Sequence, residues 1–335
     1  MLDVICQTAF VFSASSMPPP RPLRLEKLKK REVILLRQMD KALISFLNHL
    51  FLVFALMLCL NSPSAAFAGK ANPRTWLCYY GNTYGPEIYS RFDLVMLDGH
   101  YHPPLPDKSQ SSPLVFGYVS VGEVIENGHL WPLAKDKPYL IRKNQFWNSW
   151  IVDVRDSEWQ QLLFDTVIPS VLDRGFDGLF LDTFDSGLSL LNGKHGMRFR
   201  GTESALVDIT AKIKKTYPDR HIAVNRGLPV LPAIARDIRF VVVESLYSRY
   251  TEGKGYERVD ETTQQILLQQ IEAGLKINPE LGILTLDYAG DSQFDLAQEA
   301  IAFSRKKGFV PYVSTYKLDQ IFFHTLEGRP KNASK

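Results

Sequence analysis

Short apolar runs alternate with amphipathic helical patterns along most of this chain, and this alternation constrains the fold more than any other feature. Helical periodicity is present at Ser157–Leu172, Glu203–Tyr217, Glu261–Ile277 and Phe294–Lys307. Strands that alternate with helices predict a parallel sheet covered by helices. The strand-like runs are Trp76–Tyr80, Leu94–Leu97, Leu114–Val119, Trp150–Val154, Gly178–Leu181, His221–Val224, Phe240–Val243, Ile283–Leu286 and Phe309–Val313.

Nine strand candidates are one more than an eight-stranded barrel needs. The run Trp150–Val154 follows a segment rich in proline and aromatic residues that has no helical period. We therefore interpret residues 123–156 as a single long loop excursion after the third strand, with Ile151–Val154 as a short extra strand. The remaining eight strands predict an α/β fold, a single (β/α)8 TIM barrel that occupies residues 69–335.

The N-terminal part of the chain has the pattern of a secretory leader. Leu50–Leu60 is an apolar run of 11 residues, followed by the small-residue site Ala66-Phe67-Ala68. Such a run is too short to span a membrane. We predict a signal peptide at residues 39–68, an upstream extension or misplaced start at 1–38, and a secreted or periplasmic protein that begins at Gly69. An uncleaved membrane anchor is the alternative.

Charge and cysteine content exclude several other classes of protein. The chain has a net charge of +3, but residues 1–68 contain eight basic and four acidic residues, so the remainder has a net charge of −1. No nucleic-acid partner is therefore expected. Cys78 is the single cysteine after residue 68, so this part of the chain can form neither an internal disulfide nor a cysteine metal site. We expect no cofactor and a monomer with no membrane span after processing.

Polar side chains follow almost every predicted strand. In barrels of this kind the carboxyl ends of the strands carry the chemistry. Carboxylates crowded at one end repel one another and raise some pKa values, a cost that packing alone does not require. The residues at or just beyond these strand ends are Asp98, Glu123, Asp153, Asp182, Asp185, Asn225, Glu244 and Asp287.

Aromatic side chains show the same bias toward that end, and an aromatic face beside an acid suits a sugar ring, with its apolar CH face and hydroxyl edges. Glycoside hydrolysis needs one carboxylate as nucleophile or base and a second acid that is protonated. Asp182 and Glu244 follow strands four and six of the barrel, and we assign them as the catalytic pair. The expected substrate-binding residues are Tyr80, Asp98, Tyr118, Glu123, Asp153, Asp185, Asn225, Tyr247, Asp287, Tyr288 and Tyr312.

Four segments resemble glycoside hydrolase family 114, the endo-α-1,4-polygalactosaminidases and related barrels. They are Gly117–Glu123, Gly175–Asp182 with Asp185, Val243–Tyr247 and Leu286–Ala289, and the resemblance runs from about residue 75 to 316. It implies a (β/α)8 barrel, a galactosamine-rich polysaccharide substrate, Asp182 as nucleophile and Glu244 as acid/base. Asn225-Arg226-Gly227 departs from the family pattern. An inward-facing arginine would be unfavourable for a cationic polymer, so the exact polysaccharide stays open.

Two other functions compete with a retaining, two-carboxylate glycosidase. A secreted barrel could bind carbohydrate without cleaving it, since the sequence does not give the separation of the two acids. Alternatively, Asp182, Asp185 and Asp287 could hold Mg²⁺ or Ca²⁺ in a metal-dependent hydrolase, because oxygen ligands suit these ions. The sequence itself favours no metal site.

Overall fold

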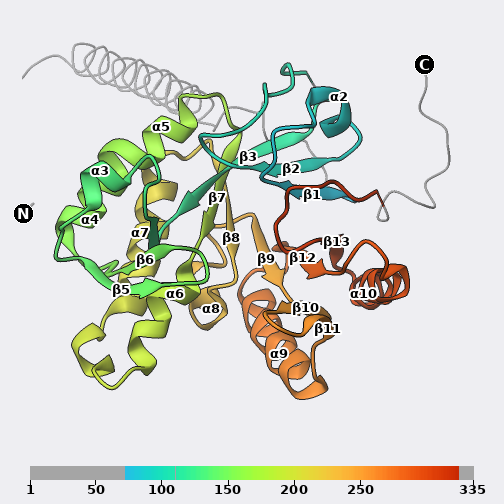
Figure 1. The fold of residues 1–335 in the computed structure, drawn as a ribbon. Coiled ribbons are helices and arrows are strands. Elements are labelled where there is room, and N and C mark those ends of the chain that lie inside the picture. Colours follow the sequence, from blue (N-terminus) through green and yellow to red (C-terminus); the bar gives the residue numbers. More distant parts are fainter. Residues whose placement is uncertain (1–71, 110, 324–335) are drawn as a thin grey trace, which may run out of the picture. The chain divides into compact units, whose positions relative to one another are not determined.

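The computed structural model describes residues 72–109 and 111–323, and within them eight parallel strands form one sheet (Figure 1). The predicted leader at 39–68, the extension at 1–38 and the predicted start at Gly69 lie outside the described residues. The sheet order is β1 (Trp76–Tyr79), β2 (Leu94–Leu97), β3 (Leu114–Ser120), β7 (Gly178–Asp182), β8 (His221–Asn225), β9 (Phe240–Glu244), β12 (Gly282–Tyr288) and β13 (Val310–Ser314).

The sheet curls into a nearly closed barrel, and this confirms the predicted (β/α)8 fold and its eight strands. Its two outer strands, β1 and β13, meet where the indole Nε1 of Trp76 donates a hydrogen bond to the carbonyl of Val310 at 2.9 Å. The strands are buried on both faces, as parallel strands covered by helices must be. All eight run the same way, so their carboxyl ends meet at one mouth.

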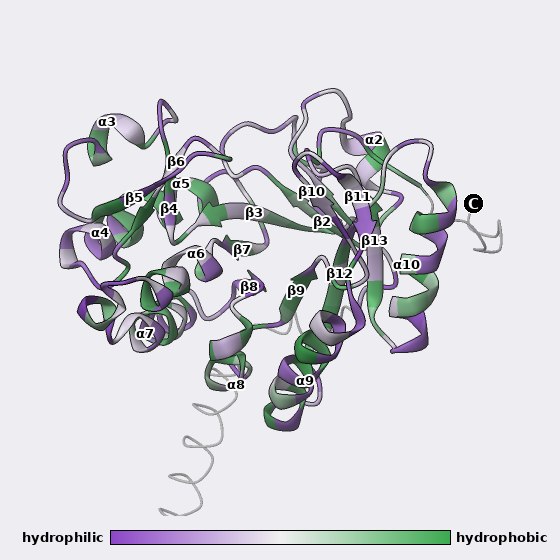
Figure 2. Ribbon diagram, turned by 60° about the horizontal axis from the view of Figure 1, so that its bottom comes forward, coloured by the Kyte–Doolittle hydropathy of each residue, from purple (hydrophilic) through white to green (hydrophobic). Residues whose placement is uncertain are grey.

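Helices cover the outside of the barrel, with hydrophobic residues on the faces that meet the strands (Figure 2). All four predicted helical segments are present, although Ser157–Leu172 contains a π-helical turn at Leu163–Val167. The helices are α2 (Pro86–Tyr89), α3 (Trp131–Ala134), α4 (Ser157–Leu162), α5 (Ile168–Leu172), α6 (Phe184–Ser189), α7 (Thr202–Thr216), α8 (Leu231–Ile234), α9 (Glu261–Ile277) and α10 (Phe294–Lys306).

The predicted excursion after β3 is present with its extra strand, but it contains three short strands where the sequence predicted one. Strands β4 (Glu123–Ile125), β6 (Ser149–Val152) and β5 (Leu140–Asn144) pair antiparallel in that order. The strand β5, with sequence LIRKN, is partly exposed along its length and has no apolar run. Its pairing depends on the neighbouring β6, so local pattern could not reveal it.

A second insertion follows β9 and forms a hairpin of β10 (Ser248–Thr251) and β11 (Gly255–Arg258), drawn beside α9 in Figure 1. Both insertions leave the barrel at the carboxyl ends of its strands, so both border the mouth. Within residues 72–109 and 111–323, no helix is long and apolar enough to cross a membrane.

Candidate active site

A pocket of about 390 Å³ opens at the carboxyl ends of the barrel strands. It contains the two predicted catalytic acids and seven of the predicted substrate-binding residues. These nine residues are Tyr80, Asp98, Tyr118, Glu123, Asp182, Asp185, Asn225, Glu244 and Tyr288. Their convergence follows from the parallel topology, because each ends or follows a strand at the same mouth.

Asn225 bridges the two catalytic candidates. Its side-chain nitrogen Nδ2 donates to Asp182 Oδ1 at 2.8 Å and to Glu244 Oε2 at 2.9 Å. An amide nitrogen carries two hydrogens that diverge by about 120°, so the two accepting oxygens lie about 5 Å apart. The three residues end β7, β8 and β9, which are neighbours in the barrel. Consecutive strands therefore set the separation of the two acids.

Burial and the nearby charge of Glu244 raise the pKa of Asp182 to about 6. Burial is the larger cause, because a carboxylate loses hydration when it leaves water. The hydrogen bond from Asn225 opposes the shift by stabilising the charged form. The pair therefore retains a proton up to about pH 6, through Asp182.

Tyrosine side chains line the pocket beside the two acids. The hydroxyl of Tyr288 donates to Glu244 Oε1 at 2.8 Å. Burial, with the charge of Asp182, raises the pKa of Tyr118 well above its usual range, and burial does the same for Tyr80. The rings of Tyr80 and Tyr118 pack edge to face, with centroids 5.4 Å apart. These phenols therefore stay neutral and can donate hydrogen bonds in the pocket.

Asn225 and the two acids that it bridges are each followed by a non-glycine residue in the left-handed backbone region. Thr183 has a φ of 66°, Arg226 of 52° and Ser245 of 57°. Such conformations cost free energy and persist when the surroundings over-determine them, as at functional sites. Thr183 is fixed by its hydroxyl, which accepts a hydrogen bond from the backbone N–H of Gly122 at 2.7 Å. The chain thus turns sharply at the end of each of these three strands.

The unexpected arginine lines the pocket, but its charge is paired. Arg226 Nε donates to Asp185 Oδ2 at 2.6 Å, and Nη1 donates to the backbone carbonyl of Glu244 at 2.9 Å. The backbone N–H of Gly227 donates to the other oxygen of Asp185 at 3.1 Å. Arg226 therefore ties the end of β8 to the end of β9 and to α6.

Two other predicted residues in the pocket also hold local structure. Glu123 is almost fully buried and accepts hydrogen bonds from the hydroxyl of Ser149 and, at 3.1 Å, from Asn144 Nδ2. Asp98 accepts from the backbone N–H groups of His100 and Tyr101, both at 2.7 Å, and so forms an Asx turn. Both acids keep the walls of the pocket in place.

The other four predicted substrate-binding residues do not line the pocket, so these assignments are corrected. Asp153 pairs with Arg155, with Nε and Nη2 of the arginine 2.8 and 2.6 Å from its oxygens. The hydroxyl of Tyr247 donates to Glu299 at 3.1 Å. Tyr312 is fully buried and packs against Trp76 in the core.

Asp287 is the fourth corrected residue and the most informative one. Alternation along β12 directs Leu286 and Tyr288 into the pocket and Asp287 to the opposite face. There Asp287 Oδ1 accepts from the backbone N–H groups of Tyr247 and Ser248, at 2.6 and 2.9 Å, while Oδ2 is buried without a hydrogen-bond partner. Burial raises the pKa of Asp287 to about 7. Asp287 thus anchors the segment that follows Glu244.

Several pocket residues were not in the predicted set. Trp147 comes from the turn between β5 and β6, whereas Tyr316 and Lys317 follow β13. No periodicity marks these positions, because they lie in turns. The aromatic bias of the sequence was the available signal.

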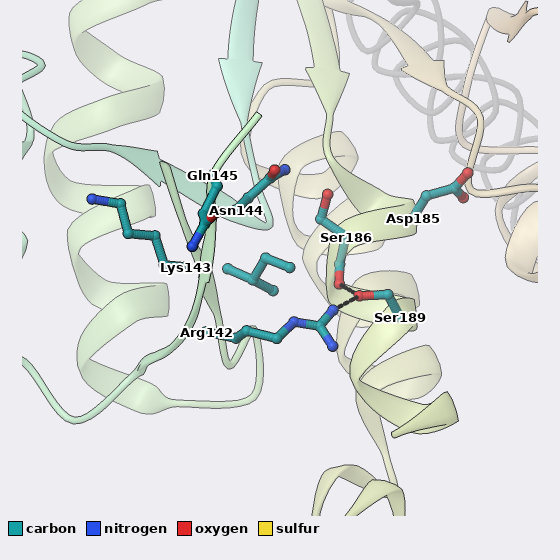
Figure 3. Close-up of a pocket in the computed structure, with 8 residues that line it drawn as sticks. Arg142, Lys143, Asn144, Gln145, Asp185, Ser186 and Ser189 are labelled. Carbon is teal, nitrogen blue, oxygen red and sulfur yellow. Dashed lines mark hydrogen bonds between the residues drawn. The ribbon is translucent and has the colours of Figure 1, made fainter. Parts of the chain in front are cut away.

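A second cleft of about 410 Å³ adjoins the main pocket and shares Asn144, Asp185 and Ser186 with it. It runs between β5 and α6, where Arg142 Nη2 donates to the hydroxyl of Ser189 at 2.7 Å (Figure 3). The open space at the mouth is therefore longer than the pocket that holds the acids.

The proposed metal triad is not assembled. Asp182 and Asp185 line the pocket, but Asp287 faces away from it. In the described part of the chain, no group of three or more histidine, cysteine, aspartate or glutamate residues is arranged to hold a metal ion.

A barrel of this topology with two acids at its mouth has the arrangement that a glycoside hydrolase needs. The model of glycoside hydrolase family GH114 matches residues 60–328, so the chain belongs to that family. The glycoside hydrolase domain of PelA from Pseudomonas aeruginosa is 26% identical, with a TM-score of 0.63 over 74% of this chain and 97% of that one. A comparison with curated protein sequences gives no significant match.

The fold is also similar to that of Ega3 from Aspergillus fumigatus, solved in complex with galactosamine. The TM-score is 0.55 at 13% identity, over 77% of this chain and 97% of that chain. The match of the family model confirms the predicted family, and with it the assignment of the protein as a glycoside hydrolase.

Proposed function

We propose that the protein cleaves an amino-sugar polysaccharide, galactosamine-rich as in the family it resembles, with retention of anomeric configuration. The observation that carries this proposal is the shared hydrogen-bond donor Asn225, which holds an oxygen of Asp182 and one of Glu244 about 5 Å apart. Retaining enzymes have carboxyl groups about 5–5.5 Å apart, whereas inverting enzymes leave roughly 6.5–9.5 Å for a water molecule.

Asp182 is the nucleophile of the proposed reaction. Its carboxylate forms a bond to the anomeric carbon while the glycosidic C–O bond breaks, and Glu244 transfers its proton to the leaving oxygen. Water then attacks the glycosyl ester and gives its proton back to Glu244, which releases Asp182. The pair needs one proton in total, and the pKa of about 6 at Asp182 supports a singly protonated pair in mildly acidic solution.

Three observations support an amino-sugar substrate. Arg226 is neutralised by Asp185, which removes the objection that an unpaired arginine would repel a cationic polymer. The carboxylates of Glu244 and Asp182 lie in the same pocket and would attract ammonium groups. Ega3, which shares the fold, was solved with galactosamine bound. Export through the predicted signal peptide would bring such an enzyme to extracellular polysaccharide.

Substitution of the two acids tests the mechanism. Asp182→Asn and Glu244→Gln should each reduce kcat on α-1,4-linked galactosamine polymer by several orders of magnitude, because each acid has a role that its amide cannot perform. A mechanism-based inhibitor that traps the glycosyl-enzyme should label the wild type and fail to label Asp182→Asn. Product stereochemistry, followed by NMR in the first turnover, should show retention.

The competing functions predict other outcomes. A carbohydrate-binding barrel without activity would bind the polymer and release no product from the wild-type protein. A metal-dependent hydrolase would lose its activity in EDTA and regain it with Mg²⁺ or Ca²⁺. Near-full activity in either substituted variant would overturn the two-carboxylate mechanism.

A further inference from the structure

Five aromatic side chains beside the pocket form a continuous cluster, which we call the aromatic ridge. Its rings contact one another in sequence: Phe146 and Trp147 are 4.8 Å apart, Phe146 and Tyr316 are 6.3 Å apart, and Tyr316 stacks on Tyr250 at 4.0 Å. Tyr256 completes the ridge, with its ring 5.2 Å from that of Tyr250.

The ridge is assembled from three separate segments at the barrel mouth. Phe146 and Trp147 lie in the β5–β6 turn, Tyr250 and Tyr256 in the β10–β11 hairpin, and Tyr316 after β13. The hydroxyl of Tyr256 accepts a hydrogen bond from the backbone N–H of Tyr316 at 3.4 Å. The rings are thus held in place before any ligand arrives, which lowers the entropy cost of binding.

Part of the ridge is unusually exposed to water. Phe146 is 46% exposed and Trp147 is 54% exposed, although both side chains are large and apolar. Contiguous exposed aromatic groups typically mark a binding surface, and the core packing of the barrel does not need these two rings. Rigid aromatic faces also bind with little loss of conformational freedom.

The ridge continues the pocket that holds the two acids. Trp147 and Tyr316 line that pocket together with Asp182 and Glu244. A chain with one sugar at the acids would therefore place neighbouring sugars against these rings. The cleft between β5 and α6 extends the open space through Asp185, Ser186 and Asn144.

We propose that the aromatic ridge binds sugar units of the polysaccharide beyond the cleaved bond, through their CH faces, and so makes the enzyme favour long chains over short ones. This inference rests on the proposed function. Carbohydrate is the occupant because the surface is continuous with the pocket of a glycoside hydrolase, where flat rings face a polar, hydroxyl-binding site.

The test compares a long and a short substrate. Trp147→Ala and Phe146→Ala should each lower kcat/KM on α-1,4-linked galactosamine polymer roughly tenfold relative to its value on the trisaccharide, because truncation of an aromatic side chain at a binding hot spot typically costs at least that much. The loss should appear mainly as a higher KM, since the rings do not contact the reacting atoms. Product sizes should also change, with fewer long fragments early in the digestion.

Tyr217→Ala is the matched control, because this partly buried tyrosine follows α7 and precedes β8, at the opposite end of the barrel. This control variant should leave the ratio of kcat/KM on the polymer to kcat/KM on the trisaccharide unchanged. A ratio that stays constant in both ridge variants would overturn the inference.

Binding distinguishes failure of this inference from failure of the proposed function. In an inactive Asp182→Asn, Glu244→Gln background, calorimetric titration with the same polymer should show roughly tenfold weaker binding after Trp147→Ala. If the acids prove dispensable for turnover but the affinity still falls, the ridge stands and the mechanism fails. If the acids are essential and the affinity does not change, the mechanism stands and the ridge inference fails.

Discussion

A single amide group joins the two carboxyl groups of the proposed catalytic pair. Asn225 satisfies one oxygen of each acid, while the hydroxyl of Tyr288 satisfies the second oxygen of Glu244. The two acids are thereby fixed without being neutralised by a cation. Like charges at this separation titrate as a unit, so the pair shares its proton.

This arrangement predicts the pH dependence of activity. Because the proposed reaction needs one proton on the pair, kcat/KM should fall as pH rises above about 6, the raised pKa of Asp182, where the pair loses the proton that it shares. The decline should approach tenfold per pH unit. A pH profile of kcat/KM measured in low-ionic-strength buffers checks this, and a flat profile between pH 5 and 8 would contradict it.

Which residues at a strand end face the pocket could be predicted only in part. Asp182, Asn225 and Glu244 were placed correctly because each follows an apolar strand at the common mouth. Asp287 was placed at the correct end of β12 but on the wrong face. Both faces of a barrel strand are apolar, so the sequence lacks the alternation that normally distinguishes them. Tyr312 lies deeper along its strand and is part of the core.

At the scale of elements, the three strands after which the chain turns sharply are the strands that hold the two acids and Asn225. The segment after β9 is held by Asp287, whose Oδ1 accepts two backbone N–H groups from it. Asp287 has no water contact, so its charge is costly. The folded state therefore favours the protonated form of Asp287.

Replacement of this acid should change stability with a defined pH dependence. The folded-state pKa of about 7 lies above the usual value of 3.8, so the wild type loses stability as pH rises from about 4 through 7. Asp287→Asn removes this loss while retaining an oxygen acceptor. The difference in unfolding free energy between variant and wild type should increase over this range by a few kcal/mol.

Urea denaturation at several pH values measures this difference. A difference that does not vary with pH would show that Asp287 ionises as easily in the folded protein as in the unfolded one. Asp153→Asn is a suitable control, because that acid is paired with Arg155 in a partly exposed loop.

Elements with strong periodicity were predicted well, and elements that depend on a partner were not. The barrel strands and the long helices α7, α9 and α10 all appear close to their predicted bounds. The strand β5 and the hairpin β10–β11 are partly exposed, and their polar sequences have no periodic apolar face. Tertiary pairing rather than local propensity forms them, and these same insertions contribute the aromatic ridge.

At the scale of the whole molecule, the barrel is rigid, and inserted segments border the mouth at the carboxyl ends of its strands. The strands and their covering helices fix the two acids, while the segments after β3 and β13 add side chains such as Trp147 and Tyr316 to the wall of the pocket. This division explains why the family could be recognised from motifs at strand ends, and why the extent of the binding surface required the structure.

Cys78 lies inside this barrel with no exposed surface, and burial raises the pKa of its thiol, with Tyr80 of the pocket wall as its hydrogen-bond partner. In a chain with Cys6→Ser and Cys59→Ser, it becomes the sole thiol. A water-soluble disulfide reagent should then modify it only when the barrel opens, because a buried protonated thiol does not react.

The rate of thiol modification therefore measures how often the barrel opens. Oligosaccharide bound to the inactive Asp182→Asn variant should lower this rate in proportion to its saturation of the site, since a ligand specific for the closed barrel suppresses opening. Kinetics followed by absorbance would report carbohydrate binding without any turnover. A rate that matches the reaction of a free thiol would show instead that Cys78 is accessible in the closed barrel.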